Sequence, residues 1–428
     1  MIKEVKLFMA DKPRIYLIDV FNRDGVQAHG VQPADIERTM LNYYDDEMGI
    51  YQSEFGFPAF KDYNFDYPTN PHFEKKYILA NLALKKAGYL PNIKLGGWVR
   101  AVVEDVEIAR ERFEDLEHLN LSISTSDVML KKKLRKSKHE IIKMMYDAVK
   151  KADELRFKTI GVNAEDASRT RHYRNQSYLE EFALAAKEAG ADRIRYCDTL
   201  GCDRTRSIYK RFRQLAEKVK LPIELHCHND TGYAVANSIE GAMGALDAGV
   251  DAYINTTPNG YGERAGNADL VSVLLTLKFS SGLRKKDILD PNIDLKMAWK
   301  ICNYASDATG IPIHPNQPGV GSNAFSHESG THADGMIKDR KNYELFGPRV
   351  LGIPTKEKRE TGRRIFVGDY SGKSAVDYVL KKYGIICRNI EETTNLIQRA
   401  KHSKKKAEFT EDELRLIAEY PDQVRLML

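Results

Sequence analysis

The stretch PIELHCHNDTGYAVANSIEGAMGALDAGVDAYINTTPNG, residues 222–260, contains a complete strand–helix–strand unit. Its two ends, 222–230 and 252–260, are rich in branched or aromatic residues and finish in polar, glycine or proline residues, which is typical of strands. The segment between them, 233–248, has the apolar spacing of a helix. Strands joined through a helix run parallel, because parallel pairing needs a crossover connection.

The same unit recurs through the first 280 residues. Clear helical patterns occupy 139–156 and 178–189, and six further β-rich runs precede the quoted stretch: 14–20, 50–57, 93–100, 119–127, 158–166 and 193–199. Eight strand–helix units in succession predict an α/β protein with a closed (β/α)8 TIM barrel. A doubly wound open sheet is the alternative, but it would be favoured by a G-x-G-x-x-G fingerprint after the first strand, which is absent.

The pattern changes after the barrel. We expect a catalytic TIM-barrel domain over 1–280 and small helical subdomains over 281–428, where proline- and glycine-rich segments separate the helical stretches. The last part, 388–428, is highly charged, which is typical of helices that face water.

Composition narrows the class of protein. The chain has 428 residues, of which 42% are hydrophobic and 30% charged, and this is ordinary for a globular protein in aqueous solution. The net charge of +5 is too small to indicate nucleic acid, and no run of about 18 apolar residues predicts a membrane span. Five cysteines without a C-x-x-C pair, and no secretory signal, favour the reducing cytoplasm.

Polar residues collect where the predicted strands end, and a parallel barrel places its active site there. The polar strand ends include Asp19 to Asp24, Glu54, Arg100, Ser124 to Asp127, Asn163 to Asp166, Asp198, Thr199, His226 to Asp230 and Asn255 to Thr257.

The strongest local signal is His226-Cys227-His228. Residues two apart in a strand share a face and lie roughly 6–7 Å apart, so both imidazoles can reach one metal ion. Asp24, just after the first strand, is the candidate carboxylate ligand. Such a set leaves positions open for substrate and suits Mn, Mg, Zn or Co. The alternative is two buried histidines that make ordinary hydrogen bonds.

Two further segments contain candidate site residues. The glycine-rich loop 259–267 carries Glu263 and Asn267 before a helix, although a tight turn with a helix cap has the same pattern. The segment 325–335 contains two histidines and two acids, which could supply an acid–base group or form a polar surface loop.

Taken together, these motifs resemble the acyl-CoA-dependent synthases that include 2-isopropylmalate, homocitrate, citramalate and Re-citrate synthases. The matching segments are Arg23-Asp24-Gly25, Glu165-Asp166-Ala167, His226-x-His228-Asn229-Asp230, Gly262-Glu263-Arg264-x-Gly266-Asn267 and His327-Glu328-Ser329-Gly330-x-His332-x-Asp334-Gly335. The resemblance spans roughly residues 14–375 and implies a TIM-barrel enzyme that joins acetyl-CoA to a 2-oxo acid.

The resemblance implies a role for each matched position. The metal ligands are Asp24, His226 and His228, with Asn267 as a further one; the catalytic residues are Arg23, which stabilises charge on the oxo group, and Glu165 and His332, which transfer protons; Thr199 holds the substrate carboxylate. Arg100 and Glu263, at their strand and loop ends, are further candidates for substrate binding.

The resemblance also bears on assembly and regulation. Relatives are commonly homodimers that lend residues across the interface, so a homodimer is implied. The helical subdomains over 281–428 leave no room for the regulatory domain of the leucine-inhibited relatives. We therefore expect no feedback inhibition by leucine.

The first motif departs from the family pattern. Asn22 replaces the usual leucine beside the oxo acid, and Val26 replaces the usual glutamate. An amide at Asn22 would suit a polar substrate, which favours oxaloacetate, giving citrate, or 2-oxoglutarate, giving homocitrate. The alternatives are 2-isopropylmalate or citramalate synthesis, a lyase of the same barrel group, and an inactive metal-binding barrel that serves as a scaffold. For Asn22 itself, the alternative to a substrate contact is that its side chain only forms hydrogen bonds within its own loop.

Overall fold

The computed structural model describes residues 12–59, 71–170, 176–354, 364–404 and 408–428. The chain forms two compact units, Met1–Ile313 and His314–Leu428. The division falls beyond the boundary expected at 280, because the segment after the last barrel helix still packs on the barrel. In particular, the Tyr304 ring lies 5.1 Å from the Tyr44 ring, and the Asn259 side chain donates a 2.8 Å hydrogen bond to the Cys302 carbonyl.

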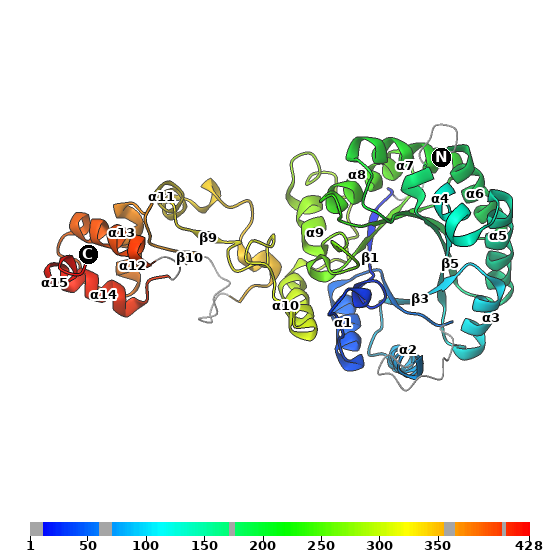
Figure 1. Cartoon of the computed structure of the whole chain (residues 1–428), viewed down its shortest axis with the longest axis horizontal. Coiled ribbons are helices and arrows are strands. Elements are labelled where there is room, and N and C mark those ends of the chain that lie inside the picture. The colour runs from blue at the N-terminus through cyan, green and yellow to red at the C-terminus, as the bar shows by residue number, and fades with distance from the viewer. Residues whose placement is uncertain (1–11, 60–70, 171–175, 355–363, 405–407) are drawn as a thin grey trace, which may run out of the picture. The chain divides into compact units, whose positions relative to one another are not determined.

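The first unit is a closed barrel of eight parallel strands in chain order, with the last strand paired to the first (Figure 1). The strands are β1 Ile15–Asp19, β2 Gln52–Gly56, β3 Lys94–Arg100, β4 His118–Ser124, β5 Thr159–Glu165, β6 Arg193–Asp198, β7 Ile223–Cys227 and β8 Ala252–Thr256. Each lies inside or within a residue of a predicted run, so the prediction of a TIM barrel is confirmed.

Helices surround the ring of strands (Figure 1). They are α1 Asp35–Met48, α2 Pro71–Lys86, α3 Val103–Arg112, α5 Lys138–Glu154, α6 Gln176–Ala189, α7 Thr205–Val219, α8 Ala234–Asp247, α9 Leu270–Phe279 and α10 Ala298–Thr309, with a short α4, Asp127–Met129, between β4 and α5. Helix α5 illustrates how the sequence sets a boundary. Ser137 and Glu140 each bind the other's backbone N–H, and this reciprocal cap starts the helix.

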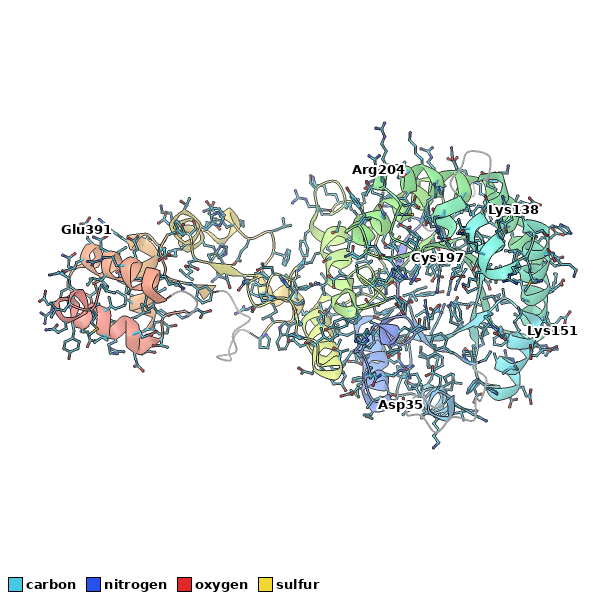
Figure 2. The ribbon with its side chains drawn as sticks, in the orientation of Figure 1. Asp35, Lys138, Lys151, Cys197, Arg204 and Glu391 are labelled. Atoms are coloured by element: carbon cyan, nitrogen blue, oxygen red, sulfur yellow. The ribbon has the colours of Figure 1, made fainter. Side chains whose placement is uncertain are left out.

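Several charged side chains lie in the interior of the barrel. Arg193 and Arg195 on β6, and Glu224 and His226 on β7, occupy alternate strand positions and are all buried. The next residue of β6, Tyr196, points the other way and packs against the Phe212 ring of α7, at 4.9 Å between centroids. Side chains fill the space within the ring of strands, where Cys197 of β6 is labelled in Figure 2. The polar side chains that form the site are therefore part of the barrel core.

The second unit is helical, as expected. Its elements are α11 Gly330–Lys338, α12 Lys373–Lys382, α13 Ile390–Lys404, α14 Glu411–Glu419, α15 Pro421–Arg425 and a small parallel pair, β9 Ser326–His327 and β10 Arg364–Ile365. Its own apolar core includes Val376, Leu380, Ile397, Leu414 and Ile417. Across the described residues of both units, every helix is too short or too polar to cross a bilayer.

Candidate active site

Three buried side chains converge at the mouth of the barrel, and we call them the triad. Asp24 follows β1, His226 lies in β7 and His228 follows β7. One potential ligand atom from each lies within 4.8 Å of the other two. The two Nε2 atoms are 3.3 Å apart, and His226 Nε2 is 4.0 Å from an Asp24 carboxylate oxygen. The structure thus brings together the three side chains predicted to bind a metal.

The hydrogen bonds of the two imidazoles fix which nitrogen is protonated. His226 Nδ1 lies 3.2 Å from the Asn255 side-chain oxygen, and His228 Nδ1 lies 3.3 Å from the Gly266 carbonyl. Both partners are acceptors, so each Nδ1 carries the proton and each Nε2 presents a lone pair. Two lone pairs and a carboxylate then face one point with no donor between the imidazoles, an arrangement that a cation would satisfy.

The protonation states of the three groups also fit a divalent ion. Burial lowers the pKa of His226 to about 3 and also lowers the pKa of His228. Burial alone would raise the pKa of Asp24, but the charge of Arg23, and then those of the histidines, lower it below its usual value. At neutral pH the set is therefore two neutral imidazoles and one carboxylate, the forms that bind metals.

Asn267 completes this side of the site. Its amide nitrogen donates to Asp24 Oδ2 at 2.7 Å and to the Tyr261 carbonyl at 3.1 Å, and its buried side-chain oxygen has no hydrogen-bond partner in the described part of the chain. A Cβ at Gly262 would lie 2.1 Å from the Asn267 amide nitrogen, so only glycine leaves room for it there. An unpartnered oxygen beside the triad fits the predicted role of Asn267 as a further ligand.

Arg23 is held on two sides by carboxylates. Its Nε is 2.5 Å from Glu54 and its Nη1 is 2.5 Å from Asp24, while its guanidinium carbon lies 5.7 Å from the centre of the Trp98 ring. Arg23 is 7% exposed, so its charge acts in surroundings of low polarity. These contacts fix the position of the arginine that is predicted to face the oxo group.

A network of buried polar and charged side chains lies beneath the mouth of the barrel and connects Arg23 with His226. We call Glu54, Arg195, Glu224 and Asn255 the barrel network. Arg195 lies 2.5 Å from both Glu54 and Glu224, and Asn255 donates to Glu224 at 2.7 Å while its oxygen faces His226. Burial raises the pKa of Glu54, but Arg195 and Arg23 outweigh it and lower the pKa to about 2. A continuous chain of contacts therefore runs from Asp24 through Arg23 and this network to His226.

Sequence reasoning assigned no role to Arg195 or Glu224. For Glu224 a signal was available, because it precedes His226 by two residues on one strand and alternation places both on one face. Arg195 is aligned with Glu224 by the register of β6 and β7, which the sequence does not give.

Two other predicted residues of the barrel, the catalytic Glu165 and the substrate-binding Thr199, belong to a second cluster at the ends of β4, β5 and β6. Glu165 accepts a hydrogen bond from Ser124 and lies 2.9 Å from the Lys133 ammonium. The Thr199 hydroxyl accepts a 2.9 Å hydrogen bond from the Asp166 backbone. The contact with Lys133, an exposed lysine beyond β4, was not predicted.

Asn22, the first of the predicted substrate contacts, bonds to α1 through its amide nitrogen. It is fully buried, and its amide nitrogen donates to the Arg38 carbonyl at 3.0 Å and to Asn42 at 2.9 Å, both on α1. Both amide hydrogens are thus used within the protein, which fits the alternative of a structural role. The buried side-chain oxygen has no hydrogen-bond partner among the described residues, so the substrate role of Asn22 stays a prediction.

Two other predicted substrate contacts lie near the ends of their elements. Arg100, at the end of β3, forms a two-pronged contact with Asp105 at 2.8 and 2.6 Å. Glu263, in the loop after β8, is exposed. Their substrate roles stay predictions.

His332 belongs to the second unit, where it lies on α11. Its exposed ring stacks on Tyr343 with centroids 4.1 Å apart and planes inclined by 25°. Nearby His327 lies 6.3 Å from it, ring to ring. The catalytic role of His332 stays a prediction.

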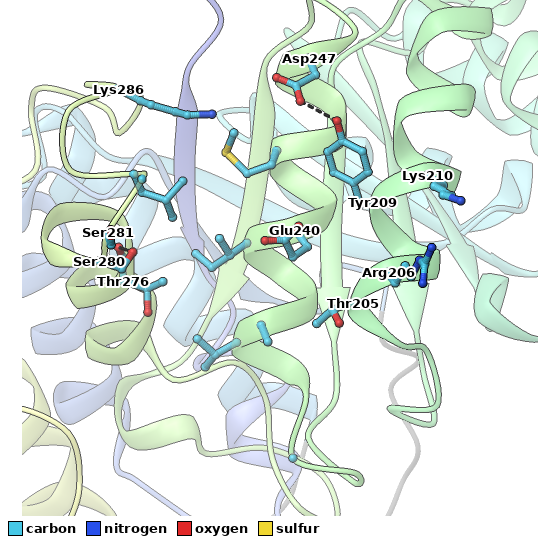
Figure 3. A pocket seen from close by; sticks show the side chains of 17 residues that line it. Thr205, Arg206, Tyr209, Lys210, Glu240, Asp247, Thr276, Ser280, Ser281 and Lys286 are labelled. Atoms are coloured by element: carbon cyan, nitrogen blue, oxygen red, sulfur yellow. Dashed lines mark hydrogen bonds between the residues drawn. The ribbon is translucent and has the colours of Figure 1, made fainter.

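A hollow of about 1010 Å³ lies elsewhere, on the helical layer between α7, α8 and α9 (Figure 3). Tyr209 and Asp247, joined by a 2.7 Å hydrogen bond, lie on its wall. None of the predicted site residues lines it, so it is separate from the triad.

Comparison with known proteins agrees with this geometry. The chain belongs to the HMGL-like family, whose model matches residues 14–304. Residues 320–408 match a second model, the homocitrate synthase post-HMGL domain-like family. Both matches confirm the family resemblance predicted from the motifs.

The relatives are condensing synthases. The chain is 48% identical to the citrate (Re)-synthase of Dehalococcoides mccartyi over 97% of this chain and 98% of that protein. It is 37% identical to 2-isopropylmalate synthase 2 of Caldanaerobacter subterraneus, over 91% and 90% of the two chains. Among solved structures, hydroxymethylglutaryl-CoA lyase from Pseudomonas aeruginosa matches with a TM-score of 0.55 at 15% identity, covering 71% of this chain and 95% of that one. This last likeness concerns the fold alone.

Proposed function

We propose that this protein, as a Re-citrate synthase, condenses acetyl-CoA with oxaloacetate, and that water then hydrolyses the thioester to release citrate and CoA. The observation that carries the substrate is the 48% identity to the citrate (Re)-synthase, which runs through both units and nearly the whole of each chain. The choice does not rest on Asn22, whose two amide hydrogens bond to α1. The reaction type rests on the broader set of synthase relatives and on the site itself.

The three converging donors fit a divalent metal such as Mn, Mg, Zn or Co, held by Asp24, His226 and His228 with Asn267 beside them. A metal bound there supplies a Lewis acid that polarises the oxo carbonyl. Arg23, fixed between Glu54 and Asp24, offsets the negative charge that develops on the carbonyl oxygen. Because both partners of Arg23 are buried anions, its position is set before substrate arrives.

Proton transfer falls to the second cluster and to the second unit. Glu165, paired with Lys133, can accept or relay a proton. His332 is exposed on α11, and we assign it the removal of the methyl proton of acetyl-CoA. Thr199 and Arg100 then bind the carboxylates of the oxo acid. We further propose a cytoplasmic homodimer in which one subunit supplies His332 to the other's barrel.

The test is an omission assay for free thiol. Thiol should appear only when acetyl-CoA, oxaloacetate and a divalent metal are all present, and citrate should form in equal amount. Thiol release without citrate would indicate thioester hydrolysis. Inactivity with every common 2-oxo acid would favour a scaffold protein and overturn the proposal.

A further inference from the structure

A dense group of positive charges follows β4. In the segment 130–138, LKKKLRKSK, six of nine residues are lysine or arginine; we call it the basic segment. It comes directly after α4, which itself follows β4, so it lies on the side of the barrel where the strands end and the site opens. Its Lys133 contacts Glu165 at the end of β5 at 2.9 Å, which ties the segment to the predicted catalytic cluster.

The basic segment forms a compact loop beside a pocket. A short π-helical turn over Leu130–Leu134 ends at Arg135, which adopts a left-handed conformation with φ of 54°. The backbone N–H groups of Arg135 and Lys136 both return to the Leu130 carbonyl, so the segment closes into a compact loop. These residues line a pocket of about 480 Å³, and the full lining is Asp127, Leu130, Lys131, Arg135, Lys136, Ser137 and Lys138. Lys138, where α5 begins, is labelled in Figure 2.

Several of these cations lack the partners that lysines have elsewhere on this surface. Some exposed lysines of the helices pair with a carboxylate one turn away, as Lys143 does with Asp147 at 2.6 Å. Within the basic segment, Lys138 pairs with Asp127 at 3.0 Å, whereas Lys131, Arg135 and Lys136 have no carboxylate within ion-pair distance among the described residues. Three clustered, unneutralised charges around one pocket repel one another and favour a ligand that carries several negative charges.

We propose that this pocket binds the phosphate groups of the nucleotide end of acetyl-CoA. The proposal rests on the proposed function, which names acetyl-CoA as co-substrate. The chemistry matches, because that nucleotide carries a sugar phosphate and a diphosphate, whereas a 2-oxo acid carries only carboxylates and is placed at the triad. Arg135 offers a planar fork and the lysines offer point charges, the two groups that proteins use to bind phosphate. The thioester end, on its long flexible arm, then reaches across the mouth toward the triad.

The test compares acetyl-CoA with S-acetylpantetheine, which has the same thioester and lacks the nucleotide. The variants are Lys131→Ala, Arg135→Ala and Lys136→Ala, and the matched control is Lys143→Ala, whose lysine is exposed on α5 outside the pocket. Each pocket variant should raise KM for acetyl-CoA about tenfold, the loss typical of one charged hydrogen bond. The kcat, the KM for oxaloacetate and all constants for S-acetylpantetheine should match those of the unaltered protein.

Two results would overturn the proposal: an unchanged KM for acetyl-CoA in all three variants, or an equal loss with both thioesters. A binding measurement separates this proposal from the proposed function. Calorimetry should show that adenosine 3′,5′-bisphosphate binds the unaltered protein, more weakly at high salt, and that Arg135→Ala weakens it about tenfold. If it binds in this way but no oxo acid supports thiol release, the pocket stands and the proposed reaction falls. If it fails to bind, the pocket assignment falls.

Discussion

At the scale of single residues, the three atoms that face one another in the triad are all hydrogen-bond acceptors. His226 and His228 turn their protonated nitrogens toward Asn255 and Gly266, so that their lone pairs face the Asp24 carboxylate. None of the three facing atoms carries a proton, so hydrogen bonds among them would satisfy them poorly. A cation is the simplest species that all three atoms can bind together.

The triad leads to a prediction about metal affinity. His226→Ala and Asp24→Asn should each abolish activity and weaken binding of Mn²⁺ by ~100-fold or more. Removing a residue that only supports a ligand costs up to ~100-fold in metal affinity, and the loss of a ligand itself should cost at least as much. Asn255→Ala, which removes only the partner of His226, should cost ~10–100-fold in affinity. Electron paramagnetic resonance of free Mn²⁺ measures the affinity, and circular dichroism checks that each variant folds. Near-normal turnover in either ligand variant would contradict the metal assignment.

Arg23 should act mainly in the transition state. Arg23→Ala should lower kcat strongly while the KM for acetyl-CoA changes little, because the developing charge on the oxo oxygen is absent in the ground state. Arg23→Lys is the matched control, since it keeps the charge but cannot contact Glu54 and Asp24 together. We expect it to recover only part of kcat. A rise in KM with kcat preserved would show instead that Arg23 binds substrate uniformly.

At the scale of elements, the sequence predicted the features that depend on period and position. Runs of β-rich residues with polar ends predicted all eight strands, and His226-x-His228 predicted a shared face, because alternation in a strand is a local property. Contacts between strands that are distant in sequence were not predictable. Arg195 reaches Glu54 across the barrel, and Lys133 reaches Glu165 from the preceding loop, and neither contact has a local signature. The setting of Asn22 was unpredictable for the same reason, since its partners lie on α1.

The contact between β1 and α1 contains a buried acid with a pH-dependent effect on stability. Burial raises the pKa of Asp19 to about 7 from 3.8, and burial and then the charge of Asp19 raise the pKa of Asp45. A carboxyl with a raised folded-state pKa contributes stability below its unfolded pKa and loses it as pH rises through the folded value. The window for Asp19 therefore runs from about pH 4 to about pH 7, and a tenfold change in its acid dissociation constant corresponds to roughly 1.4 kcal/mol.

Asp19→Asn should remove this pH dependence. The amide stays neutral and can still accept the hydrogen bond from the Phe21 backbone that Asp19 accepts at 2.6 Å. Relative to the unaltered protein, the variant's Tm should rise progressively between about pH 4 and about pH 7 and level off above that, because the two states differ in proton binding only between the unfolded and folded pKa values. Thermal unfolding at several pH values measures it, with Asp153→Asn, exposed on α5, as control. A Tm difference that does not vary with pH would show that Asp19 is ionised in the folded protein throughout this range.

At the scale of the whole molecule, the candidate groups are divided between two units. The triad, Arg23 and Glu165 belong to the barrel, whereas His332 belongs to the helical unit that begins at His314. The match to the citrate (Re)-synthase covers 97% of this chain and therefore includes both units. The groups predicted to be catalytic are therefore found in both units.

Complementation tests whether two subunits share a site. His226→Ala and His332→Ala homodimers should each be inactive. Co-expression with different tags gives a mixed dimer in which one barrel keeps its metal ligands and receives the intact His332 of the other chain. This mixed dimer, purified through both tags, should regain activity well above that of either parent. An inactive mixed dimer would show that each subunit supplies its own His332.

The most direct test of the central claim is the thiol-release rate with a panel of 2-oxo acids, measured with acetyl-CoA and Mn²⁺. We predict that kcat/KM is highest for oxaloacetate, with citrate as the product. It should be lower by ~100-fold or more for 2-oxoisovalerate, 2-oxoglutarate and pyruvate. The groups that bind the second carboxylate of oxaloacetate stay unpaired with 2-oxoisovalerate and pyruvate, which lack that carboxylate, and with 2-oxoglutarate, whose carboxylate lies one carbon further away. A preference for 2-oxoisovalerate would make the protein a 2-isopropylmalate synthase and contradict the proposed substrate.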